Sequence, residues 1–230
     1  MPYKIEVEGA DGSGKSTAVQ VLYDAFRSAG QRTMIMSEAG FHKIDACVQM
    51  KKMALDPSSF LSPLSMELLF AAQRVENDLW IKNSPEAQKY DIILSDRGYV
   101  SHLAYGYPNV SREKIDILFR ELLNDVTKPN VILYLGVSAD VAMERIRARG
   151  EPTDRIEGLG KEHQAKVIEN YESLLSGRFS KTLTQRGGHI LQIDANRGKK
   201  DVQDELRRCA QTIVDMRAAR TAKDILLNEG

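Results

Sequence analysis

The feature that most constrains this chain is a glycine-rich segment near its N-terminus, Gly9–Ser16, which reads G-x-x-x-x-G-K-S. In this spacing the backbone N–H groups of a tight loop surround the phosphates of a nucleoside triphosphate. The flanking sequence agrees, because residues 3–8 alternate like a short strand and residues 16–22 begin a helical pattern. A chance match is the alternative, and the flanking pattern argues against it. We therefore predict a phosphate-binding loop between a strand and a helix.

Two side chains of this loop carry the chemistry of triphosphate binding. We expect Lys15 to reach the β- and γ-phosphates and the hydroxyl group of Ser16 to be a ligand of Mg²⁺. The loop therefore predicts a nucleoside triphosphate and Mg²⁺, and by itself it leaves open a GTPase, an ATPase motor, a kinase and an ABC-type ATPase. The predicted ATP-binding residues of the loop are Gly9, Ala10, Asp11, Gly12, Ser13, Gly14, Lys15, Ser16 and Thr17.

Length, charge and cysteine content limit the remaining classes of protein. A chain of 230 residues suits one α/β domain over residues 1–230. Its 32 Lys and Arg residues balance 32 Asp and Glu residues, so we expect neither nucleic acid nor a membrane as a partner. Cys47 and Cys209 are far apart and predict reduced thiols in a cytoplasmic protein. The sequence contains neither a cleavable leader pattern nor an apolar run long enough for a transmembrane helix.

Four further apolar, β-branched runs recur along the chain, separated by segments long enough for helices. They are residues 32–36, 90–94, 130–137 and 189–193. With residues 3–8 they predict five parallel strands with helices on both faces, which is the three-layer α/β fold of P-loop NTPases. Ligands of such sheets bind at the carboxyl ends of the strands. We therefore expect the segments that follow the strands to converge on one cleft.

Asp96 and Arg97 directly follow the run at residues 90–94. An Asp at the end of a buried strand is the expected place for a ligand of Mg²⁺, bound directly or through another ligand. The guanidinium group of Arg97 is a fork suited to a second phosphate, which the triphosphate does not supply. The alternative is an Asp–Arg ion pair that caps a helix. The preceding loop favours the phosphate interpretation.

Four ordered motifs of the chain resemble those of thymidylate kinases of the bacterial type, within the nucleoside-monophosphate kinase group. The resemblance spans roughly residues 3–200, and its motifs are Glu8–Thr17, Leu69–Arg74, Ser95–Tyr105 and Arg145–Glu157. It implies transfer of the γ-phosphoryl group of ATP to dTMP, giving dTDP for dTTP biosynthesis. It also implies a homodimer, with which an apolar stripe on a predicted helix over residues 62–80 is compatible.

The resemblance assigns roles on the acceptor side. Asp11 would accept a hydrogen bond from the sugar 3′-hydroxyl, and its alternative role is that of a turn residue. Phe70 would stack on the pyrimidine, although such a residue is more often core. Arg74 lies one helical turn further on and would donate to O4 of thymine or uracil, with a surface salt bridge as the alternative. Tyr105 would pack beneath C2′ of the sugar. The remaining predicted substrate-binding residues are Glu38, Phe41, Arg97, Ser101 and His102.

An arginine-rich lid is expected at about residues 145–160. In the resembled family a catalytic arginine comes from the phosphate loop or from the lid, and Gly12 occupies the loop position here. We therefore predict Arg149 and Arg155 as catalytic side chains, with Arg145 stacking on adenine. The predicted catalytic residues are Asp11, Lys15, Arg97, Arg149 and Arg155, and the predicted metal ligands are Ser16 and Asp96.

The sequence departs from the family pattern on the acceptor side. The turn at residues 37–43 lacks the usual proline and arginine, and Lys43 is a candidate replacement for a phosphate contact. His102 stands where Asn or Thr is common, and Gly106 replaces a usual Gln. These changes leave open a kinase of another deoxynucleoside monophosphate, or a deoxynucleoside kinase with Glu38 as its base. A nucleotide-dependent switch ATPase is a further alternative, against which Arg97 argues.

Overall fold

The computed structural model describes residues 1–56, 58–106, 108, 110–121, 126–150, 155–177, 180–181, 184 and 188–228. Its centre is a five-stranded parallel sheet with the strand order β2-β3-β1-β4-β5. The strands are β1 (Tyr3–Glu8), β2 (Thr33–Ser37), β3 (Ile92–Asp96), β4 (Val131–Gly136) and β5 (His189–Asp194). The α/β fold with five parallel strands that the sequence predicts is therefore confirmed.

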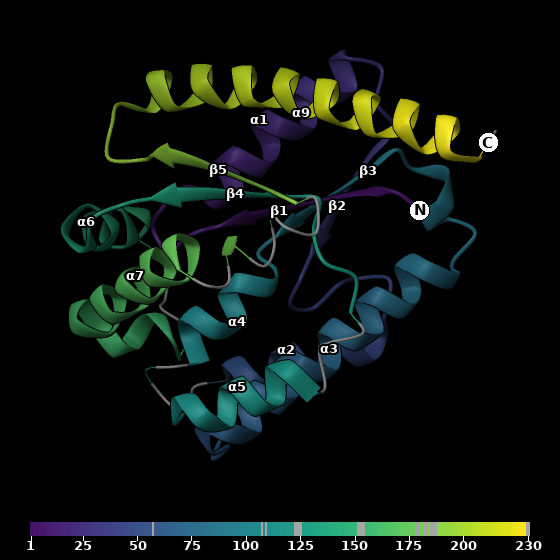
Figure 1. Cartoon of the computed structure of the whole chain (residues 1–230). Coiled ribbons are helices and arrows are strands. Elements are labelled where there is room, and N and C mark those ends of the chain that lie inside the picture. The colour runs from purple at the N-terminus through teal and green to yellow at the C-terminus, as the bar shows by residue number, and fades with distance from the viewer. Residues whose placement is uncertain are drawn as a thin grey trace.

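Helices cover both faces of the sheet (Figure 1). The helices are α1 (Lys15–Ser28), α2 (Asp45–Leu55), α3 (Pro63–Asn83), α4 (Tyr99–Gly106), α5 (Arg112–Glu121), α6 (Ala139–Arg149), α7 (Gly160–Ser176) and α9 (Lys199–Asn228). Helices α1 and α9 pack together on one face, whereas α4 and α7 lie on the opposite face, with α2, α3 and α5 beyond them. Two 3₁₀ turns, Ala87–Lys89 and Glu157–Leu159, complete the described elements.

The register of the sheet brings the functional segments to one edge. Asp96 at the end of β3 pairs with Val7 of β1 and with Ser37 of β2. Because the strands are parallel, the phosphate loop after β1 and the turns after β2 and β3 all emerge at this edge. The convergence predicted from the sequence is therefore present.

The two faces of β1 differ in character because alternate side chains point to opposite faces of a strand. Ile5 and Val7 are fully buried and belong to the same apolar core as Phe26 of α1. On the other face, Glu6 and Glu8 are also buried, and their carboxylates accept hydrogen bonds from backbone N–H groups of α4. The central strand therefore binds one helix layer by apolar packing and the other by buried hydrogen bonds.

The long predicted helices are present, and α9 is attached to the segments that precede β2 and β3. Arg217 of α9 donates to Asp91 Oδ1 at 3.1 Å and to Gln31 Oε1 at 2.7 Å.

Cys47 and Cys209 are unpaired thiols. No helix in the described ranges combines the length and the apolar character needed to cross a membrane. Residues 151–154, in the middle of the predicted lid, lie outside the described residues.

Phe26 tests the packing between α1 and the sheet. Its side chain is completely buried, so Phe26→Ala removes a large apolar contact and should lower the free energy of unfolding by about 3–5 kcal/mol. Phe60 is the matched control, because its side chain is fully exposed and Phe60→Ala should change stability by less than about 0.5 kcal/mol. Urea unfolding of both variants measures the difference. Equal losses would contradict the assigned core.

Candidate active site

The phosphate loop has the backbone conformation that its glycines predict. Gly9, Gly12 and Gly14 all have positive φ angles, of 152°, 78° and 94°. A Cβ atom at Gly12 would lie 2.3 Å from the carbonyl oxygen of Ala142 on α6. The close approach of α6 therefore excludes a side chain at position 12, including an arginine. This contact explains why position 12 is a glycine, and the prediction that the catalytic arginine comes from the lid depends on that glycine.

Lys15 lies at the start of α1 with its ammonium group folded back into the loop. Its Nζ donates to the carbonyl oxygen of Ala10 at 2.8 Å and lies 3.8 Å from Asp11 Oδ1. Burial lowers the pKa of Lys15 to about 8, and the positive charge of Arg97 adds to this effect. Phosphate oxygens placed in the loop would add negative charge next to this buried ammonium group, whose carboxylate partner, Asp11, is not in close contact with it.

Two oxygen-bearing side chains lie at the same edge of the sheet. Asp96 ends β3, close enough for its carboxylate to act on the pKa of Lys15, and Ser16 is exposed in the first turn of α1. Carboxylate and hydroxyl oxygens are the ligands that Mg²⁺ prefers, and the ion usually keeps several waters and binds substrate phosphates. These two residues therefore fit the Mg²⁺ that accompanies a nucleoside triphosphate.

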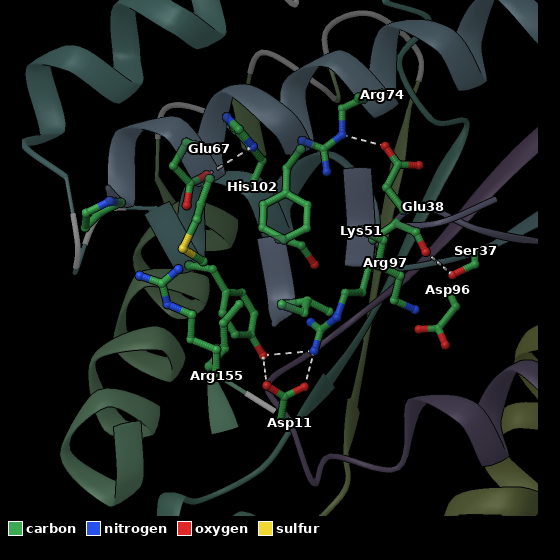
Figure 2. Close-up of a pocket in the computed structure, with 18 of the residues that line it drawn as sticks. Asp11, Ser37, Glu38, Lys51, Glu67, Arg74, Asp96, Arg97, His102 and Arg155 are labelled. Atoms are coloured by element: carbon green, nitrogen blue, oxygen red, sulfur yellow. Dashed lines mark hydrogen bonds and ion pairs between the residues drawn. The ribbon is translucent and has the colours of Figure 1, made fainter. Parts of the chain in front are cut away.

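Arg97 is the centre of an ionic cluster that joins β3 to the phosphate loop (Figure 2). Its guanidinium group pairs with Asp11 and donates to the hydroxyl oxygen of Tyr105 at 3.0 Å. Tyr105 in turn donates to Asp11 Oδ2 at 3.0 Å. Burial alone would raise the pKa of Asp11, but the charges of Arg97 and Lys15 outweigh it and keep the pKa below its usual range. Arg97 thus pairs with the loop and not with its neighbour Asp96.

A cavity of about 350 Å³ opens beside this cluster. This volume is within the range of small-molecule sites in proteins. The sequence-predicted residues that line it are Asp11, Glu38, Phe70, Arg74, Asp96, Arg97, Ser101, His102, Tyr105 and Arg155. Further lining residues, which the sequence analysis did not find, include Lys51, Met66 and Glu67. The cavity therefore combines charged groups at the phosphate loop with an aromatic ring from α3.

Arg74 reaches this cavity as half of a buried ion pair. Its Nε donates to Glu38 Oε1 at 2.5 Å and its Nη2 donates to the carbonyl oxygen of Gly98 at 2.8 Å. Asn77 holds the backbone of Glu38 by donating to its carbonyl oxygen at 2.8 Å. Among the described residues, the buried Nη1 of Arg74 has no hydrogen-bond acceptor. The surface salt bridge considered for Arg74 is therefore wrong, and one donor remains for a ligand.

Phe41 and Lys43 do not line the cavity. Phe41 is fully buried and packs with Met36 and Ile81, its ring edge against Trp80 at 4.9 Å between ring centres. Lys43 Nζ lies 3.0 Å from Glu86 Oε1 instead of at the cavity. The turn after β2 directs both side chains away, and Lys51 of α2 supplies a cavity ammonium group in their place. A half-buried helical lysine has no sequence signal that distinguishes it from a surface lysine.

The turn between β3 and α4 is held from below by β1. Glu6 Oε2 accepts a hydrogen bond from the N–H group of Tyr99 at 2.9 Å, and its Oε1 lies 2.9 Å from Lys4 Nζ. A Cβ atom at Gly98 would lie 2.1 Å from the carboxyl carbon of Glu6. Ser101, predicted to bind substrate, donates instead to Glu8 Oε2 at 2.5 Å, although it also lines the cavity. Position 98 thus has to be a glycine, because any side chain there would collide with the buried carboxylate of Glu6.

The three predicted lid arginines lie at three different places. Arg145 donates to the carbonyl oxygen of Ala195 at 2.8 Å and lines a second hollow beside Ser13, Gly14 and Thr17. Arg155 donates to the carbonyl oxygen of Leu61 at 2.8 Å and lines the first cavity. Arg149 is ion-paired with Glu157 at 2.7 Å. Only Arg155 of the predicted catalytic pair therefore borders the first cavity in this structure.

Comparison with known proteins gives a consistent match. The thymidylate kinase family model matches residues 7–206. The thymidylate kinase of Symbiobacterium thermophilum is 27% identical over 219 residues, which are 93% of this chain and 94% of that protein. The probable thymidylate kinase of Archaeoglobus fulgidus is 25% identical over 217 residues, covering 93% and 97%. A Thermoanaerobacter thymidylate kinase is 30% identical over 173 residues, covering 74% and 82%.

Gly98→Ala tests the contact between β1 and the turn. The added methyl group would collide with the carboxyl group of Glu6, so we expect a loss of about 1–3 kcal/mol in the free energy of unfolding. In a Glu6→Ala background the same substitution should cost less than about 0.5 kcal/mol, because the colliding group is gone. Gly198→Ala is the matched control, with only an ordinary 3.4 Å contact to Asp201. An equal cost of Gly98→Ala in both backgrounds would contradict this packing.

Glu67 predicts a dependence of stability on pH. Burial raises the pKa of its carboxyl group to about 7 in the folded protein. Because this value exceeds that of the unfolded chain, stability is lost as the pH rises from about 4.5 to about 7. Glu67→Gln should therefore raise the free energy of unfolding, relative to the wild type, by up to about 3 kcal/mol at pH 8 and leave it unchanged at pH 4.5. Urea unfolding at both pH values measures this, with the exposed Glu113→Gln as a control that should show no such gain.

Proposed function

Because the chain belongs to the thymidylate kinase family, we propose that it transfers the γ-phosphoryl group of ATP to the 5′-phosphate of dTMP, giving dTDP for dTTP biosynthesis. Asp11 of the phosphate loop lines the same cavity as Phe70 and Arg74 of α3, and this juxtaposition carries the proposal. The phosphate loop and the side chains proposed to bind the nucleobase thus border one cavity. The proposed acceptor phosphate lies between them, beside Arg97.

Phosphoryl transfer in this site needs positioning and charge neutralisation more than proton transfer. An oxygen of the acceptor phosphate, which is already anionic, attacks the γ-phosphorus in line as the bond to the β-phosphate oxygen breaks. Lys15 would hold the donor phosphates, and Arg97 and Lys51 would hold the acceptor phosphate. Mg²⁺, held through Ser16 and Asp96, would neutralise charge on the donor phosphates when bound.

The base and sugar contacts follow from the lining of the cavity. Phe70 offers an aromatic face for stacking. The guanidinium group of Arg74, whose Nη1 has no acceptor among the described residues, is a donor suited to O4 of thymine. Cytosine has an amino group at that position, which would bring donor against donor. Asp11 would accept from the 3′-hydroxyl group, while Tyr105, held by Arg97, would leave little room for a 2′-hydroxyl group.

The arginines of the lid supply the remaining charge in this proposal. Arg155 borders the acceptor cavity and Arg145 borders the hollow beside Thr17, which suits the adenine of ATP. Arg149 would reach the transferring phosphoryl group by exchanging its ion pair with Glu157 for phosphate oxygens. Closure of the lid over both substrates would exclude water and suppress hydrolysis of ATP.

The proposed setting is that of a cytoplasmic homodimer. Two unpaired cysteines suit a reducing compartment. Leu68 and Leu79 of α3 are each nearly half exposed, which supports a dimer contact along this helix. No observation favours a deoxynucleoside kinase, since Glu38, the base that such an enzyme would use, is committed to its ion pair with Arg74.

A coupled assay of ADP formation tests the substrate. The purified protein with ATP and Mg²⁺ should phosphorylate dTMP faster than dUMP, and should not phosphorylate dCMP, dGMP or thymidine at a comparable rate. Lys15→Ala should lower kcat at least about 100-fold, because the donor phosphates lose their buried cation. Absence of activity with every monophosphate would overturn the proposed function. Activity with thymidine alone would replace it with a nucleoside kinase.

The lid arginines have a separate test. An arginine on the transferring phosphoryl group contributes about 10³–10⁵ in rate, so we expect Arg149→Ala and Arg155→Ala each to lower kcat by at least about 10²-fold. Arg147, exposed on the same helix as Arg149, is the control, and Arg147→Ala should change kcat less than about twofold. A normal kcat in both test variants would assign the charge stabilisation to residues outside the lid.

A further inference from the structure

Glu67 is an acidic side chain at the nucleobase end of the acceptor cavity. It lies on α3 three residues before Phe70 and seven before Arg74, so the three side chains follow one face of the helix. All three line the cavity. Figure 2 shows Glu67 and Arg74 along this helix with His102, from α4, near Glu67. A base stacked on Phe70 would therefore have a guanidinium group toward one end of the helix and a carboxyl group toward the other.

The carboxyl group of Glu67 is buried with little to bind it. Glu67 is 5% exposed, and within the described parts of the chain its carboxyl group has one close polar neighbour, His102 Nδ1, at 3.4 Å from Oε2. Burial, followed by the charge of Arg74, holds the pKa of His102 well below its usual range, so this contact is not an ion pair. A buried carboxyl group with so few partners is destabilising unless a ligand satisfies it.

The neighbouring helix leaves room for this carboxyl group. A Cβ atom at Gly106 of α4 would lie 3.2 Å from Glu67 Oε2 and 3.0 Å from Ile115 Cδ1. A longer side chain at position 106 would therefore press on Glu67 and on α5. The glycine keeps the acidic group at the cavity wall, where a ligand can reach it.

We propose that the carboxyl group of Glu67 binds the N3–H and O2 edge of the acceptor base, while Arg74 binds O4. This inference rests on the proposed function and adds the group that selects an imide-bearing pyrimidine, thymine or uracil. A protonated carboxyl group has one donor and one acceptor, which match the O2 and N3–H atoms of the imide. Burial of Glu67, which raises its pKa to about 7, favours this protonated form. Cytosine has no hydrogen on N3 and would lose this match.

The test compares dTMP with its N3-methyl analogue, in which a methyl group replaces the imide hydrogen. The wild type should prefer dTMP by at least about 10-fold in kcat/KM, as expected for loss of the paired edge. Glu67→Gln should keep that preference, because an amide also has a donor and an acceptor. Glu67→Leu should raise the KM for dTMP about 10–100-fold, leave the KM for ATP unchanged and reduce the preference to less than about threefold.

Glu76→Leu is the matched control, since Glu76 lies on the same helix at an exposed position. It should leave every one of these constants unchanged. Calorimetric titration of each variant with dTMP and N3-methyl-dTMP, without ATP, gives the same comparison independently of catalysis. Loss of discrimination in Glu67→Leu binding supports the inference even if the phosphoryl-transfer proposal fails.

Three results would overturn the inference. Equal discrimination between dTMP and its N3-methyl analogue in the wild type and in Glu67→Leu would show that Glu67 does not read the imide. Absence of dTMP binding by the wild type would show that dTMP is not a ligand of this cavity. Preference for dGMP over dTMP would mean that an ionised Glu67 binds N1–H and the 2-amino group of a purine instead.

Discussion

The hydrogen bonds between two buried carboxylates of β1 and the first turn of α4 are the constraint on which the site depends. Glu6 accepts from Tyr99, and Glu8 accepts from Val100 and Ser101. A helix N-terminus favours negative charge, so these carboxylates both cap α4 and fix its distance from the sheet. Because α4 begins two residues after Arg97, the same bonds hold Arg97 in its left-handed conformation, with φ 68°.

The charges of the site are paired before any substrate binds. Arg97 is held by Asp11, Arg74 by Glu38, and Lys15 by the carbonyl oxygen of Ala10. Removing one partner of a buried ion pair leaves an uncompensated charge, which is strongly destabilising. Pairing thus keeps each cation in place at low cost in the empty protein. Phosphate oxygens can then replace the internal partners without large movements, which is the preorganisation that phosphoryl transfer requires.

Local patterns predicted the elements that depend on short-range chemistry. The alternation of residues 3–8 and the glycines of the loop gave the strand, the turn and α1 correctly, because strand period and positive φ are properties of a few adjacent residues. Local patterns did not predict that the side chain of Phe41 lies in the core and not at the cavity. Whether an aromatic side chain after β2 faces the cavity or the core depends on Trp80 and Ile81, which are distant in sequence. Lys51 and Glu67 were missed likewise, since a charged helical residue usually faces solvent.

The sequence by itself determined the phosphate loop, the five parallel strands and the convergence of their ends on one edge of the sheet. These follow from glycine conformation, hydrophobic period and the rule that parallel strands share a direction. The tertiary structure alone decided which charges meet there. The pairing of Arg74 with Glu38, the fit of Gly98 over Glu6 and the burial of Glu67 beside Gly106 each join separate elements. The distance between two side chains, unlike the period of a helix or strand, is set by packing.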